Sequence, residues 1–118
     1  MNPYDKYNNN RILSASPNAL ILMLYDGAIK FGNIAKKAIE DKDIETAHKN
    51  IIKIENIFKE LLNCLDDKYP VSKDFRIVYE NIINLLIKAN VSKNPADIEN
   101  VMIEIREIRD IWKKITKI

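Results

Sequence analysis

The residues that could carry out chemistry in this chain are few. His48 is the only histidine, and Glu45 stands three positions before it, a spacing that puts both side chains on one face of a helix. Di-iron helical bundles use this Glu-x-x-His spacing twice and add glutamates from two further helices. The chain has no second histidine. We therefore expect His48 to be a partly exposed surface residue and expect no metal site.

The other reactive residue types also argue against an enzyme. Cys64, the only cysteine, stands in a leucine-rich run, which predicts a buried apolar side chain rather than a reactive thiol. Asp66 and Asp67 are adjacent carboxylates in a predicted turn, where we expect them to be solvated. The sequence has neither a glycine-rich phosphate loop nor a nucleophile elbow. We predict no enzymatic activity and no cofactor.

Charge and hydropathy argue against nucleic-acid binding and membrane insertion. The 19 basic and 17 acidic residues give a net charge of +2 and are interspersed, whereas nucleic-acid-binding proteins gather Lys and Arg on one face or in a tail. Near the C-terminus, Lys113, Lys114 and Lys117 complement a helix dipole. No apolar run approaches the roughly 18 residues that span a bilayer, and no signal-peptide pattern opens the chain. With one cysteine and no internal disulfide, a cytoplasmic location is expected.

The elements that position these residues are four predicted helices. Apolar residues recur every three or four positions over residues 17–39, 44–65, 74–89 and 95–117. The predicted N-caps are Ser16, Asp43, Ser72 and Asn94, and proline follows the first and last of them. No segment alternates with period 2. We predict an all-α fold, an antiparallel up-down-up-down four-helix bundle of residues 16–118 preceded by a mobile N-terminal arm of residues 1–15.

Each predicted helix has an apolar stripe for the bundle core. The stripes, in chain order, are Leu20, Leu24, Ala28, Phe31, Ala35 and Ala38; Ile44, Ala47, Ile51, Ile54, Phe58, Leu61 and Leu65; Phe75, Val78, Ile82, Leu85 and Ala89; and Ile98, Val101 or Met102, Ile105, Ile108, Trp112 and Ile115.

Apolar residues exceed what these stripes need. The surplus residues are Ile21, Tyr25 and Ile29; Ile52, Ile57 and Leu62; Ile77, Tyr79, Ile83, Leu86 and Ile87; and Ile103, Ile111 and Ile118. A monomer rarely leaves an apolar patch of more than a few hundred Å² uncovered. Three explanations stand open: the protein oligomerises, a partner lies in its grooves, or the N-terminal arm covers them.

The opening of the chain resembles the flagellar export chaperone family FliS. The resemblance is carried by Tyr7, Ala15-Ser16-Pro17, Leu20, Met23-Leu24-Tyr25, Gly27-Ala28 and Phe31. Later residues are compatible with it: Ala38-Ile39-Glu40, Ala89-Asn90, Arg109 and Trp112. The resemblance covers almost the whole chain, and its ASP…MLYDGA block is its most specific part.

The resemblance implies a helical bundle that holds flagellin in the cytoplasm before export. Proteins of this family bind the C-terminal segment of flagellin, which is disordered when free, and block premature polymerisation. The client wraps around the bundle as extended stretches and short helices, and the N-terminal arm can lie over part of the client site and move aside.

We therefore expect three groups of partner-binding residues. The arm would be anchored by Tyr4, Tyr7 and Ile12, since a tyrosine ring is apolar and its hydroxyl tolerates water. The outer side of the first helix, which the arm or client would cover, would present Ile21 and Tyr25. The client grooves would be lined by Ile52, Ile57, Ile77, Ile83 and Ile87.

Three alternatives use the same features differently. The apolar surplus would also serve a homodimer, a self-associating bundle without a client. A di-iron carrier is a weaker alternative because the chain has a single histidine. A regulator that binds another flagellar protein is compatible with the family resemblance.

Overall fold

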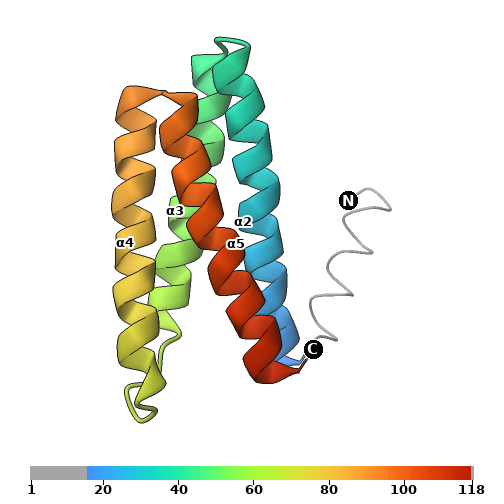
Figure 1. Cartoon of the computed structure of the whole chain (residues 1–118), viewed down its shortest axis with the longest axis vertical. Coiled ribbons are helices and arrows are strands. Elements are labelled where there is room, and N and C mark those ends of the chain that lie inside the picture. The colour runs from blue at the N-terminus through green and yellow to red at the C-terminus, as the bar shows by residue number, and fades with distance from the viewer. Residues whose placement is uncertain (1–15, 118) are drawn as a thin grey trace, which may run out of the picture.

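A computed structural model describes residues 16–117 (Figure 1). They form four helices: α2 (Pro17–Glu40), α3 (Ile44–Asn63), α4 (Val71–Ser92) and α5 (Pro95–Thr116). Consecutive helices run in opposite directions, α2 and α4 each pack against both α3 and α5, and no strand occurs in this part of the chain. The predicted all-α four-helix bundle is confirmed. The predicted arm, with Tyr4, Tyr7 and Ile12, lies outside the described residues.

Side-chain caps start three of the helices, as predicted. In each, a side-chain oxygen accepts a hydrogen bond from a backbone N–H of the first turn: Ser16 from Ala19 at 3.2 Å, Asp43 from Thr46 at 3.2 Å, and Asn94 from Ala96 at 2.9 Å. These bonds satisfy N–H groups that have no partner within a helix.

The fourth predicted cap is wrong. Helix α4 begins at Val71, before Ser72, and has no side-chain cap. The buried Ser72 hydroxyl instead donates to the Asp66 carbonyl at 2.6 Å and ties the first turn of α4 to the loop before it. Helix α4 is therefore longer at both ends than the predicted 74–89, and α3 ends at Asn63 rather than at residue 65.

The core follows the predicted stripes of α3 and α5 in their central turns. Fully or nearly fully buried there are Ala47, Ile51, Ile54, Phe58 and Leu61 on α3, and Ile98, Val101, Met102, Ile105 and Ile108 on α5. At the helix ends the prediction fails, because Ile44 is 51% and Ile115 is 56% exposed. The predicted burial of Cys64 is also wrong: it is exposed at the end of α3, where the chain leaves the bundle.

The buried face of α2 is rotated from the predicted stripe. Tyr25 and Gly32 are buried, whereas Leu24 and Phe31, both predicted for the core, are half-buried. A Cβ atom placed on Gly32 would lie 1.8 Å from the Met102 sulfur. Because Gly32 has no side chain, α5 approaches the α2 backbone there, and this contact turns the Tyr25–Gly32 side of α2 inward.

The buried face of α4 keeps Phe75, Ile82 and Ala89 of the predicted stripe but is turned partly toward Tyr79 and Leu86. Tyr79 and Leu86 are 2% and 0% exposed, whereas the predicted Val78 and Leu85 are half-buried. The hydroxyl of Tyr79 hydrogen-bonds that of Tyr25 across the core. This polar partner lets Tyr79 be buried although it stood outside the predicted core stripe.

Candidate partner-binding surface

Helix α2 begins and α5 ends at the same end of the bundle, the lower end in Figure 1. A hollow of about 720 Å³ opens among residues of this end. We call it the open-end hollow. Its apolar wall comes from all four helices and includes Ile21, Leu61, Leu65, Phe75, Tyr79 and Trp112, and its rim includes Tyr69, Val71 and Ile115. The rim side chains are 57%, 47% and 56% exposed, respectively. Concave apolar surface with accessible rim side chains is the kind of site that accepts an apolar segment of another protein.

An aromatic cluster lies beneath and beside the open-end hollow. Phe75 and Trp112 both line the hollow and meet edge to face with ring centroids 5.9 Å apart. Trp112 also meets Tyr25 at 6.4 Å, and Phe58 meets Tyr79 at 5.6 Å. Rings in this geometry hold one another in place, so one wall of the hollow is preformed.

The outward position predicted for Tyr25 is wrong. Its side chain is 0% exposed, and its hydroxyl is paired with that of Tyr79 inside the bundle. Burial, and then the neighbouring Tyr79, raises the pKa of Tyr25 far above its usual range, and burial likewise raises the pKa of Tyr79. Both hydroxyls are therefore protonated at neutral pH.

Trp112 fastens the end of α5 to the start of α2. Its indole N–H donates to the Asn18 carbonyl at 3.0 Å, in the first turn of α2, where Asn18 belongs to the wall of the hollow. Further along the same pair of helices, the Arg109 Nη1 atom lies 3.9 Å from the Asp26 Oδ1 atom. These contacts position the α2 and α5 walls of the open-end hollow relative to each other.

Of the residues predicted to bind a partner, Ile21 lies on α2, and Ile57 lies on α3 and faces α2. Ile21 is half-buried in the wall of the hollow. Ile57 is half-buried between α3 and α2, with its Cδ1 atom 3.9 Å from the Cβ position that Gly27 lacks. Ile57 thus packs between helices instead of projecting from the surface.

Helical spacing aligns Ile52, Ile83 and Ile87 with a contact between α3 and α4. His48 on α3 lies 3.0 Å from Asn90 on α4, measured from Nδ1 to Nδ2, which fixes the edges by which these helices face each other. On α3, Ile52 stands one turn after His48. On α4, Ile87 stands three positions and Ile83 seven positions before Asn90. Residues at these spacings share a helix face, so all three lie along these edges. We call them the α3–α4 strip.

Two of the three strip residues are half-buried, and Ile87 is 48% exposed. Ile77 is 67% exposed on the outer face of α4 and does not join the strip. His48 is exposed, as predicted, and bonds to Asn90, while Glu45 pairs with Lys49 at 3.0 Å. Glu45 and His48 thus have separate partners, and residues 16–117 hold no group of three or more potential metal ligands.

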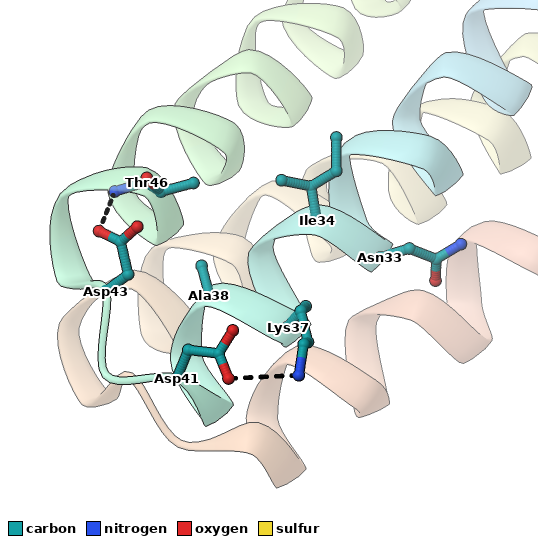
Figure 2. A pocket seen from close by; sticks show the side chains of 7 residues that line it. All are labelled: Asn33, Ile34, Lys37, Ala38, Asp41, Asp43 and Thr46. Carbon is teal, nitrogen blue, oxygen red and sulfur yellow. Dashed lines mark hydrogen bonds and ion pairs between the residues drawn. The ribbon is translucent and has the colours of Figure 1, made fainter.

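A second, smaller hollow lies at the α2–α3 turn and has a volume of about 390 Å³ (Figure 2). Its charged groups already make ion pairs or hydrogen bonds within the protein. Lys37 pairs with Asp41 at 3.2 Å, and Asp43 caps α3 by accepting from the Thr46 N–H, a bond that lowers the pKa of Asp43. These groups close the turn, so the open-end hollow is the stronger candidate site.

Sequence reasoning missed the open-end hollow as a site. Leu65, Phe75, Trp112 and Ile115 were assigned to core stripes, and Val71 was given no role. The only signal in the sequence is that most of these residues stand near the ends of apolar stripes, where a helix can separate from its neighbours.

None of the helices in residues 16–117 has the length and hydropathy needed to cross a membrane.

Comparison with known proteins shows which family the chain resembles. A family model described as flagellar protein FliS matches residues 1–118. The chain is 34% identical over 113 residues to the flagellar secretion chaperone FliS of Bacillus subtilis, covering 96% of this chain and 85% of that protein. It is 32% identical over 114 residues to the FliS of Campylobacter jejuni, a match that covers 95% of this chain and 89% of that protein. It is 30% identical over 108 residues to the FliS of Salmonella typhimurium, a match that covers 89% of this chain and 80% of that protein.

Proposed function

Because the chain belongs to the FliS family, we propose that it is a cytoplasmic flagellar secretion chaperone whose client is the C-terminal segment of flagellin. Similar proteins carry the name flagellar secretion chaperone, which supports the export role. The observation that carries the client site is the open-end hollow, an apolar concavity built by all four helices. Holding the client segment there would keep it from polymerising before export.

The α3–α4 strip supplies the second proposed contact surface. A client segment that is disordered when free buries on the order of 1,000–3,000 Å² when it folds on its partner, which is more than one hollow provides. We propose that the segment continues from the hollow along Ile52, Ile83 and Ile87, with Ile77 as an outlying contact. Ile57 supports this surface from between α2 and α3.

The N-terminal arm is proposed to compete with the client. Pro17 and Asn18, at the start of α2, line the open-end hollow. Tyr4, Tyr7 and Ile12 are side chains of the kind that fill an apolar hollow, since a tyrosine ring is apolar while its hydroxyl can remain in water.

The test is a calorimetric titration of the full chain with the C-terminal segment of flagellin from the same genome. Trp112 is the only tryptophan and lines the hollow, so its emission reports independently on occupancy. We expect one-to-one binding, a negative heat-capacity change and a shift of Trp112 emission. Absence of binding at about 50 μM, a free energy weaker than about −6 kcal/mol, would contradict the proposal and make self-association the next measurement.

Two substitutions on α5 localise the site. Ile115 and Ile103 are 56% and 44% exposed on the same helix, but only Ile115 belongs to the hollow. Ile115→Glu places a charge where apolar client atoms would lie, and we expect affinity to fall about tenfold or more. The matched control Ile103→Glu should bind like the unmodified chain. Equal loss from both variants would argue against the open-end hollow as the client site.

A further inference from the structure

The hydroxyls of Tyr25 and Tyr79 leave one hydrogen-bond donor unaccounted for. The two side chains are 0% and 2% exposed, and each hydroxyl has the other as its partner. Each neutral phenol carries one proton, and burial keeps both hydroxyls neutral. A single bond between them uses one proton, so the second proton has no acceptor among residues 16–117.

The position of the pair decides which hydroxyl has the unused proton. Tyr79 belongs to the wall of the open-end hollow, whereas Tyr25 lies behind it in the core. When Tyr25 donates to the Tyr79 oxygen, the unused proton belongs to Tyr79, which is the member of the pair that lines the hollow. The opposite arrangement would leave the Tyr25 proton inside an apolar core, where an unmade hydrogen bond is costly.

We propose that the Tyr79 hydroxyl is a specificity-determining hydrogen-bond donor to the segment that fills the open-end hollow. This inference rests on the proposed chaperone function. It adds a polar requirement to a site that is otherwise apolar, with Leu61, Leu65 and Phe75 in the same wall. A wholly apolar segment would fill the space but leave the Tyr79 proton unpaired.

The chemistry of the acceptor follows from its surroundings. A carboxylate would have to lose its hydration in an apolar wall, so a neutral carbonyl oxygen is the fitting acceptor. Carbonyls inside a helix are already used by the helix itself, whereas those of an extended stretch or of the last helical turn are free. We therefore assign to this position a backbone carbonyl from an extended stretch or a helix C-terminus of the client.

The experiment compares Tyr79→Phe with Tyr25→Phe in the full chain, using the C-terminal segment of flagellin as the probe. Both variants remove one hydroxyl, keep the ring and break the same internal bond. We expect Tyr79→Phe to weaken binding about fivefold to tenfold, the effect of losing one neutral hydrogen bond. Tyr25→Phe should bind within about twofold of the unmodified chain, since the Tyr79 donor remains.

Urea unfolding without the probe is the second measurement. The two variants should lose similar stability, because each breaks the same hydroxyl pair. If both variants lose affinity equally, the pair has only a structural role and the inference is wrong. If neither loses affinity, the client does not use the Tyr79 proton, and the inference again fails while the chaperone function stands. If the unmodified chain does not bind the probe, both fail.

Discussion

At the scale of single residues, Gly32 controls how closely two helices pack. A Cβ on this residue would lie 1.8 Å from the sulfur and 2.6 Å from the methyl carbon of Met102, which is itself 1% exposed. The buried methionine has little room to move aside. We predict that Gly32→Ala lowers the free energy of unfolding by about 1–3 kcal/mol, the usual cost of overpacking, as measured by urea denaturation.

Gly27 provides the matched control on the same helix. Its added Cβ would lie 3.9 Å from Ile57, an ordinary contact. We expect Gly27→Ala to be neutral or to stabilise by up to about 1 kcal/mol, because alanine favours the helix. If the two variants have equal stability, close approach at Gly32 does not limit the packing of α2 against α5.

At the scale of elements, α4 depends on the loop before it. It is the one helix in residues 16–117 without a side-chain N-cap, and the Ser72 hydroxyl ties it to the Asp66 carbonyl at 2.6 Å. We predict that Ser72→Ala lowers the free energy of unfolding by about 1 kcal/mol and speeds amide exchange at the start of α4. Exchange that instead rises equally along α4 would show that Ser72 does not act locally.

The sequence predicts these elements better than the surfaces they create. Periodicity located all four helices, and capping residues located the starts of three, because both are local properties. The rotation of α2 and α4 could not be predicted, since it depends on contacts across the bundle: Gly32 against Met102, and Tyr25 against Tyr79. Apolar spacing alone does not decide whether Leu24 or Tyr25 is buried in the core.

The open-end hollow could not be predicted from the sequence for the same reason. Phe75 and Trp112 have the spacing of core residues, and whether they pack fully depends on how far the helix ends separate. Of the predicted client residues, the α3–α4 strip could be placed only once the His48–Asn90 contact showed which edges of α3 and α4 face each other. Ile77, with the same residue type, lies away from it.

At the scale of the whole molecule, the arm and the client are proposed to compete for one hollow. Deleting residues 1–12 should therefore tighten flagellin binding or speed its association, because no competitor has to leave first. Stopped-flow Trp112 fluorescence measures the rate, and calorimetry measures the affinity. A truncated chain that binds as before, or more weakly, would count against competition by the arm.

The start of α2 and the end of α5 meet at one corner of the bundle, where the Trp112 indole bonds to the Asn18 carbonyl at 3.0 Å. This proximity makes residues 16–117 suitable for circular permutation. A short linker would join the two ends at that corner, and the chain would be reopened at residues 41–43, leaving every helix intact. The new termini would lie about 36 Å away along α2, so labels attached there would lie far from the hollow.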